Sequence, residues 1–284
     1  MNQSSKIRSL FSAAPIAIVV SALLLQLGGC ASSNQTAPAS AAPTMKESEI
    51  ASGPSSASPT RDELLAIIAS PDRRAADRTN DIRRKPVEML YFIGVNRGMN
   101  VLDLSAGGGY TSELLARTVG PKGRVIAQVA PRPEGPPPSF ASLTERANSL
   151  TAGKIVPVLQ KFETPVPADM ASNNFELATM MFNYHDLGHL GVDRAQMNKA
   201  VFAALKPGSM YIIADHSGRP GTGISESSTL HRVEEGFVRK EVEAAGFKFI
   251  ESAEFLRNPA DPRDKNVPDN GQPKDEFVLK FVKP

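Results

Sequence analysis

The sequence predicts an α/β fold built on a doubly wound, mostly parallel sheet. From residue 61 onward, short apolar segments alternate with amphipathic ones, which is the pattern of a parallel sheet covered by helices on both faces. Residues 175–182 form a nearly continuous apolar run, as in a strand buried on both faces. The last two apolar segments have no helix between them, so we expect these two strands to pair antiparallel.

Local signals place the individual elements. Pro86 suits the first position of a helix, and Gly120 and Gly246 suit positions just past helix ends. We expect helices at 62–69, 86–93, 110–119, 139–150, 193–205 and 233–245. We expect strands at 101–104, 124–129, 155–159, 175–182, 210–214, 247–252 and 277–282. The charged segment 72–85 is left open, as a cover folded over a ligand or as a solvated helix face.

Residues 1–29 have the build of an export signal. Lys6 and Arg8 precede an apolar run that is too short and interrupted for a typical transmembrane helix. Leu27-Gly28-Gly29-Cys30 resembles a bacterial lipobox, where the signal is removed and the new N-terminal cysteine is lipidated. By the same resemblance, the non-acidic Ala31 favours the outer membrane. We therefore predict a lipoprotein signal peptide, lipidation at Cys30, and a periplasm-facing position in the bacterial envelope with contact to the membrane through the lipid.

The composition of the remaining residues predicts a tether followed by one domain. Residues 30–60 are rich in Ala, Ser, Pro and Thr and predict a disordered tether, because they offer too little apolar surface to offset the entropy of ordering. Residues 61–284 are enough for one well-buried domain. Removing residues 1–29 would remove two of the 32 basic residues and none of the 30 acidic ones, leaving no net charge. We therefore expect no nucleic-acid partner, and the oligomeric state stays open.

The stretch VLDLSAGGGYTSELL, residues 101–115, reads as a strand, a glycine-rich turn and a helix. Gly107 and Gly109 tolerate positive φ and would let the backbone approach a ligand closely. Asp103 lies near the end of the strand, where its carboxylate would orient the amides of the turn or a ligand group. The alternative is a tight strand-to-helix connection that binds nothing.

Together with MMFNYHDL, NKAVFAALKPGSMYIIADHS and LHRVEEGFVRKEVEAAGF, this stretch resembles class I S-adenosylmethionine-dependent methyltransferases, and more narrowly a group of exported bacterial methyltransferase-like proteins. The resemblance covers about residues 72–284. It implies a Rossmann-like, seven-stranded sheet with an antiparallel last strand in a methyltransferase-like domain at 61–284. It also implies S-adenosylmethionine as the cofactor. The residues that it implies for cofactor binding are Asp103, Ser105, Gly107, Gly109 and Asn183.

Two positions depart from the family pattern. Ser105 stands where the first glycine of the motif is usual. The second strand ends in Val129 and Ala130, where most members of the family have an acid that accepts hydrogen bonds from the ribose hydroxyls. Loss of a charged acceptor would cost about 1.5–3 kcal/mol in cofactor affinity. Gln128 would serve as a neutral acceptor if the register shifted by one residue.

Polar residues that follow the fourth and fifth strands are the candidates for catalysis. His185 could act as a general base toward the methyl acceptor, and Tyr184 could form a wall of the pocket. The alternative is that His185 and Asp186 only cap the following helix through satisfied hydrogen bonds. Asp215 and His216 end the next strand, and because neighbouring strand residues point to opposite faces, either one is expected to face the pocket.

Other sites have weaker support. His185 and His189 have i, i+4 spacing, but Gly188 between them argues against a regular helix, so we expect no metal. His231 and Arg232 are expected at the start of the last helix, where Arg232 would bind an anionic substrate or be solvated. Two functions remain open: methyl transfer to a small molecule or another envelope acceptor, or a lipid-anchored binding module that kept the fold without the reaction.

Overall fold

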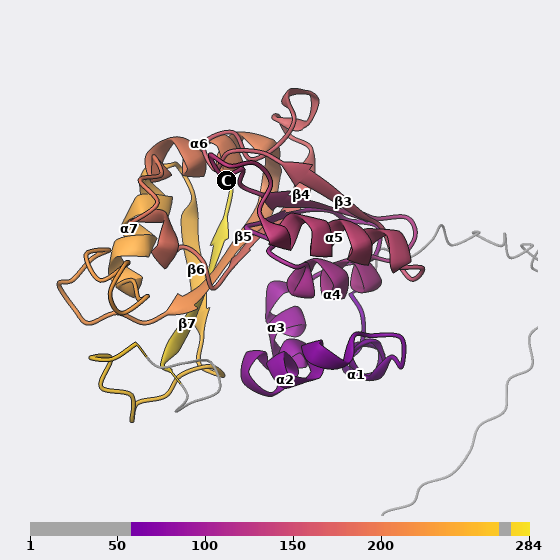
Figure 1. Cartoon of the computed structure of the whole chain (residues 1–284), viewed down its shortest axis with the longest axis horizontal. Helices are drawn as coiled ribbons and strands as arrows, with labels where there is room; N and C mark the ends of the chain where they lie inside the picture. Colours follow the sequence, from indigo (N-terminus) through magenta and orange to yellow (C-terminus); the bar gives the residue numbers. More distant parts are fainter. Residues whose placement is uncertain (1–57, 267–273) are drawn as a thin grey trace, which may run out of the picture. The chain divides into compact units, whose positions relative to one another are not determined.

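Seven strands form one sheet in the part of the chain that the computed structural model describes, residues 58–266 and 274–284 (Figure 1). Their order across the sheet is β3-β2-β1-β4-β5-β7-β6. The strands are β1 (Asn100–Leu104), β2 (Arg124–Val129), β3 (Ile155–Leu159), β4 (Phe175–Met181), β5 (Leu205–His216), β6 (Lys248–Ala253) and β7 (Glu276–Val282). Strands β1 to β5 pair in parallel, and β7 runs antiparallel to both β5 and β6. The predicted fold class is confirmed.

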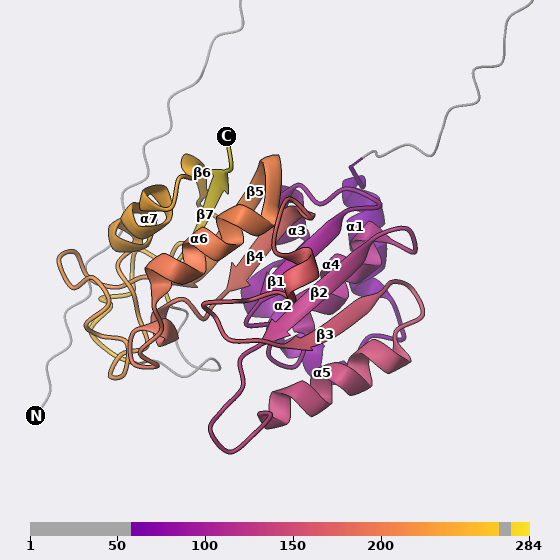
Figure 2. The ribbon, with the colours of Figure 1, turned by 90° about the horizontal axis from the view of Figure 1, so that it is seen from above.

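Helices cover both faces of this sheet. They are α1 (Arg61–Ala69), α2 (Ala75–Arg84), α3 (Pro86–Ile93), α4 (Tyr110–Val119), α5 (Pro138–Ser149), α6 (Arg194–Ala204) and α7 (Glu235–Ala244). One apolar core joins α1, α3, α4 and α5 to one face, and a second core joins α6 and α7 to the other. Figure 2 shows α5 beside β3 at one edge of the sheet and α7 beside β6 at the other. Because both faces are covered, the strands read as apolar runs in the sequence.

Local chemistry explains the element boundaries near the N-terminal end of the described chain. Thr60 and Glu63 form a reciprocal capping box that begins α1. Lys85 has a left-handed backbone with φ 43°, which ends α2 and lets α3 begin directly at Pro86. Residues 75–84 of the charged segment are helical, and three residues of this helix line the hollow described below, which favours the cover over the solvated helix face.

Two boundaries differ from expectation. Strand β5 begins at Leu205 rather than near Met210, because Leu205 already pairs with Phe175 before a register shift in β4. Helix α7 begins at Glu235, so His231 and Arg232 lie in the loop before it.

No helix within the described ranges is long and apolar enough to cross a membrane. The predicted signal peptide, the lipidation site Cys30 and nearly all of the predicted tether lie outside the described residues.

Candidate functional site

A hollow of about 660 Å³ opens at the carboxyl ends of β1, β2 and β4. It is lined by three residues of α2, by residues 103–108, by residues 129–132 after β2, and by residues 181–183 with Asp186 and His189. The order of the strands reverses between β1 and β4, and ligands of open α/β sheets bind at this kind of switch point. The volume lies within the range of small-molecule sites, about 300–1,000 Å³.

The glycine turn between β1 and α4 forms one wall of the hollow. Gly107 has φ 55°, and a Cβ added there would meet no atom within 4 Å. Ser105 is also left-handed, with φ 53°, which explains why glycine is usual at its position. The Ser105 amide donates to Gln128 Oε1 at 2.8 Å, and the Ser105 hydroxyl donates to Asn183 Oδ1 at 2.5 Å. The turn is therefore held by side chains from β2 and from the segment after β4.

Gln128 is not among the residues that line the hollow, so its side chain does not reach a ribose there. It is fully buried, its side-chain oxygen accepts from the Ser105 amide, and its side-chain nitrogen donates to the Gln160 carbonyl at 2.7 Å. The hypothesis that Gln128 replaces the missing acid is therefore wrong. Val129, Ala130 and Arg132 line the hollow at the end of β2, and none of them supplies a carboxylate there.

Gly109 has a packing role. Its φ is 86°, and an added Cβ would lie 2.7 Å from Leu143 Cδ1 and 2.9 Å from Arg146 Cδ. It does not line the hollow, in contrast to Gly107 and Gly108. The glycine at position 109 allows α5 to approach the turn, so its predicted contact with the cofactor is corrected.

Asp103 lines the hollow but does not orient the amides of the turn. Its two carboxylate oxygens accept from Ser112 Oγ at 2.5 Å and Thr179 Oγ1 at 2.8 Å. Burial raises the pKa of Asp103 to about 6, and these two hydrogen bonds only partly oppose the shift. A buried carboxyl with a raised pKa beside a hollow is typical of a functional site.

We expect Asp103→Asn to raise the free energy of unfolding at pH 8, by up to about 3 kcal/mol. The folded state disfavours the charged carboxylate, so Asp103 takes up its proton at a higher pH in the folded chain than in the unfolded chain. The wild type therefore gains stability as the pH falls through about 6. The advantage of asparagine should therefore fade between pH 6 and 4. Urea unfolding at pH 4, 6 and 8 measures this, with Asp62→Asn on the exposed side of α1 as control. A less stable Asp103→Asn at pH 8 would contradict the assignment.

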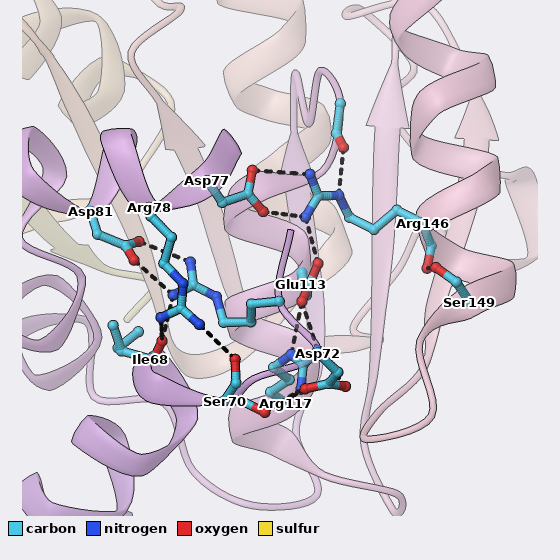
Figure 3. A network of polar contacts seen from close by, with 12 residues as sticks. Ile68, Ser70, Asp72, Asp77, Arg78, Asp81, Glu113, Arg117, Arg146 and Ser149 are labelled. Atoms are coloured by element: carbon cyan, nitrogen blue, oxygen red, sulfur yellow. Dashed lines mark hydrogen bonds and ion pairs between the residues drawn. The ribbon is translucent and has the colours of Figure 1, made fainter. Parts of the chain in front are cut away.

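Arg146 of α5 connects α2, which lines the hollow, with the glycine turn. Figure 3 shows its contacts with Asp77 and Glu113. Its Nη1 lies 2.6 Å from Asp77 Oδ2 of α2 and 2.5 Å from Glu113 Oε2 of α4. Its Nε donates to the Gly108 carbonyl at 2.8 Å. Asp77, Glu113 and Arg146 are all buried. Helix α2, which the sequence left open, is thus fixed against the hollow by a buried ionic network.

Asn183 and Asp186 form the part of the wall that follows β4. Besides accepting from Ser105, Asn183 donates from Nδ2 to Asp186 Oδ2 at 2.7 Å. Both residues line the hollow. The predicted pocket position of Asn183 is consistent with this placement, although its partners there are protein groups.

His185 lies behind this wall. Its Nδ1 is 2.6 Å from Asp215 Oδ1, its Nε2 is 3.1 Å from Asp186 Oδ1, and its side chain is 6% exposed. Burial alone would lower the pKa of His185, but Asp215 and Asp186 outweigh burial and raise it to about 10. An imidazole with both nitrogens engaged and so high a pKa is a poor general base, which corrects the predicted catalytic role.

Tyr184 does not form a wall of the hollow. Its ring is fully buried in the core under α6 and α7, and its hydroxyl donates to Glu241 Oε2 at 2.8 Å and accepts from Asn198 Nδ2 at 2.9 Å. The prediction for this residue is wrong because the backbone after β4 turns its side chain to the other face of the sheet.

Asp215 and His216 do not line the hollow either. Asp215 is fully buried and accepts from the backbone amides of His185 and His216, both at 2.7 Å. The His216 ring lies 5.7 Å from the Phe182 ring, and its Nδ1 is 2.9 Å from Glu276 Oε1. Burial lowers the pKa of His216. Both residues therefore support the wall from behind.

Sequence reasoning expected His231 at the start of the last helix and did not connect it with the site. It stands in the loop before α7 with φ 51°, and its Nδ1 lies 3.2 Å from Asp186 Oδ1. The two residues are 45 positions apart, and no spacing pattern connects them. The neighbouring Arg232 is fully buried and paired with Asp261 at 2.9 Å, so it is neither solvated nor free for a substrate.

Comparison with known proteins gives a fold and no sequence relative. No protein-family model matches the chain, and no curated protein matches it in sequence. A SAM-dependent methyltransferase from Aquifex aeolicus has a similar structure, with TM-score 0.52 and 19% identity over 75% of this chain and 100% of that one. An arsenic(III) S-adenosylmethionine methyltransferase from Chlamydomonas reinhardtii gives TM-score 0.51 and 18% identity over 78% of this chain and 73% of that one.

The structure of the cyclase SpnF is similar to the same degree, with TM-score 0.50 and 15% identity over 78% of this chain and 92% of that one. The chain thus has the fold of the SAM-dependent methyltransferases. Because a protein named for cyclisation has the same fold, the fold alone does not identify the reaction.

Proposed function

We propose that this protein is an S-adenosylmethionine-dependent methyltransferase of the bacterial envelope, which acts on a small molecule or another envelope acceptor. The observation that carries the proposal is the hollow over the glycine turn. It is about 660 Å³ in volume, lies at the switch point of the sheet, and is bordered by a turn whose Gly107 leaves room for close approach.

The residues present fit the cofactor. The space beside Gly107 is the space that a Cβ would fill at any other residue, and the buried Asp103 carboxyl borders the same hollow. The backbone of residues 105–108 and the Asp103 carboxyl would hold S-adenosylmethionine there. When bound, the cofactor supplies an activated methyl group to a nucleophile.

The chain itself contributes position. Helix α2 lines the hollow with Asp77, Asn80 and Arg84, and the Arg146 network fixes it in place. Holding two reactants in the right geometry accounts for much of the rate of a bimolecular transfer. Where the acceptor must lose a proton, Asp186 and His189 are the titratable groups that the segment after β4 contributes to the lining.

A second candidate is a binding module without transferase activity. The observation that favours it is the end of β2, where Val129 and Ala130 occupy the place of the usual acid and Gln128 is committed to the Ser105 amide. An exported chain would also have to find a cytosolic cofactor outside the cytosol. The missing acceptor would lower affinity about ten- to a hundred-fold.

Calorimetric titration of the purified full-length chain with S-adenosylmethionine and S-adenosylhomocysteine separates the two functions. We expect binding of both ligands at a stoichiometry of one, weakened by the missing acid into about the micromolar-to-millimolar range. If neither ligand produces heat at millimolar concentration, the methyltransferase proposal fails and the binding module remains.

Envelope location is part of the proposal and has its own support, the lipobox-like Leu27–Cys30 stretch after an apolar run. We expect a fatty-acid label to enter the wild-type chain in bacterial cells and to be lost in Cys30→Ser. Equal labelling of both chains would contradict anchoring at Cys30. The same chains, separated by density into inner and outer membranes, test the outer-membrane position.

A further inference from the structure

The chain has four histidines, of which His185, His189 and His231 lie beside Asp186 and His216 lies beside His185. The ring of His185 lies 5.4 Å from that of His216 and 5.6 Å from that of His231, and His231 lies 6.0 Å from His189. They come from the segment after β4, the end of β5 and the loop before α7. The fold thus brings the four imidazoles of the sequence into one cluster, of which His189 lines the hollow.

Three of these side chains have the spacing of a ligand set. Asp186 Oδ1 lies 3.1 Å from His185 Nε2 and 3.2 Å from His231 Nδ1. One ligand atom from each of the three residues falls within 4.8 Å of the others. Ligands about 2.0–2.1 Å from a tetrahedral centre lie about 3.4 Å apart, so small side-chain movements would admit an ion.

The surrounding hydrogen bonds fix these ligands as they are fixed in metal sites. His185 directs its Nδ1 to the buried Asp215 carboxylate at 2.6 Å, which leaves Nε2 directed at Asp186. Asp186 has its other oxygen held by Asn183 at 2.7 Å. A carboxylate on the far nitrogen of a ligating histidine is the usual support of such ligands, because it sets the tautomer and the ring orientation.

The backbone gives a further indication at His231. Its φ of 51° is uncommon for a residue other than glycine, and it lies in the long loop between β5 and α7. Backbone strain of this kind is concentrated at functional sites. The conformation presents the half-exposed imidazole to Asp186.

We propose that His185, Asp186 and His231 bind one divalent first-row transition metal ion, with Zn²⁺ as the best match to two imidazoles and a carboxylate. Three protein ligands leave a coordination position open, as in catalytic rather than structural zinc sites. Since Asp186 also lines the hollow, that position adjoins the proposed site of methyl transfer. The site does not depend on the proposed transferase function, and metal binding can be measured without the cofactor.

The test is competition for Zn²⁺ between a chromogenic chelator and the untagged full-length chain carrying Cys30→Ser, which removes the only thiol of the sequence. We expect one ion per chain. His231→Asn should bind more weakly by over a hundredfold, because even loss of a supporting partner costs about 10- to 100-fold. Asparagine tolerates the left-handed backbone at this position. Zn²⁺ should raise the unfolding temperature of the parent chain and leave that of His231→Asn unchanged.

His189→Gln is the matched control. His189 lies beside the cluster, with its Nδ1 2.9 Å from Ser227 Oγ and 3.8 Å from Asp186 Oδ1, a distance too long for a hydrogen bond. The His189→Gln chain should bind Zn²⁺ with an affinity within about threefold of that of the parent chain. Binding of less than one ion per five chains, or equal affinity in the parent chain and His231→Asn, would show that the contacts around Asp186 are proton-bridged ion pairs only. Loss of binding in His189→Gln with retention in His231→Asn would overturn the ligand set.

Discussion

Gly107→Ala should weaken S-adenosylmethionine binding about 5- to 150-fold. The new methyl group would enter the hollow, since no protein atom lies within 4 Å of its position, and a methyl group forced into a filled site costs about 1–3 kcal/mol. The free protein should lose only about 1 kcal/mol of stability, because alanine is mildly strained at φ 55°. Calorimetric titration measures the affinity, and thermal unfolding without ligand measures the stability.

Gly98→Ala is the matched control for this variant. Gly98 has φ 83°, a Cβ added there also meets nothing within 4 Å, and the residue is exposed in the turn before β1, outside the lining of the hollow. The two alanine variants should therefore lose similar stability, and only Gly107→Ala should lose affinity. Equal affinity in both would mean that the ligand does not approach the turn, and the proposed cofactor site would be wrong.

Much of the fold could be predicted from the sequence because its signals are local. The apolar run of β4 and the proline at the start of α3 act within a few residues, and the structure confirms both. Strand β5 was predicted too short because its first residues are set by pairing with Phe175, which lies 30 positions earlier. Pairing across the sheet leaves no trace in the residues of one strand.

The site was less predictable because it is built from distant segments. Sequence reasoning placed Asp103, Ser105, Gly107 and Asn183 at the hollow, where the structure has them. It assigned Tyr184 to the same wall, but only the path of the backbone after β4 decides which way that ring turns.

The charge state of His185 also depends on a residue that is distant in the sequence. The polar partners of His185 are Asp186, next to it in the sequence, and Asp215, on the neighbouring strand. A histidine after a strand suggests a general base, and only the second carboxylate, which the fold supplies, converts it into a paired cation. For His231 the sequence offered even less, since its contact with Asp186 depends on the path of the whole loop before α7.

Arg146→Met should lower the free energy of unfolding by about 3–5 kcal/mol, the largest stability effect that we expect from a single charged side chain here. The change removes the partner of Asp77 and one partner of Glu113, and both carboxylates are buried. It also leaves the Gly108 carbonyl without its hydrogen bond from Nε. Urea unfolding at neutral pH measures the loss.

Arg61→Met provides the comparison. Arg61 pairs with Glu88 at 2.9 Å, but its side chain is 58% exposed, and pairs of this kind contribute about 0–1 kcal/mol. A loss below about 1 kcal/mol in Arg146→Met as well would contradict the network.

Because Arg146 connects α2 with the glycine turn, Arg146→Met should also weaken the binding of S-adenosylmethionine. Arg61→Met should change neither the stability nor the affinity. Adding Asp77→Asn to Arg146→Met should recover part of the stability, since one unpaired buried charge is removed, but it should not recover the affinity, because α2 stays detached from the turn.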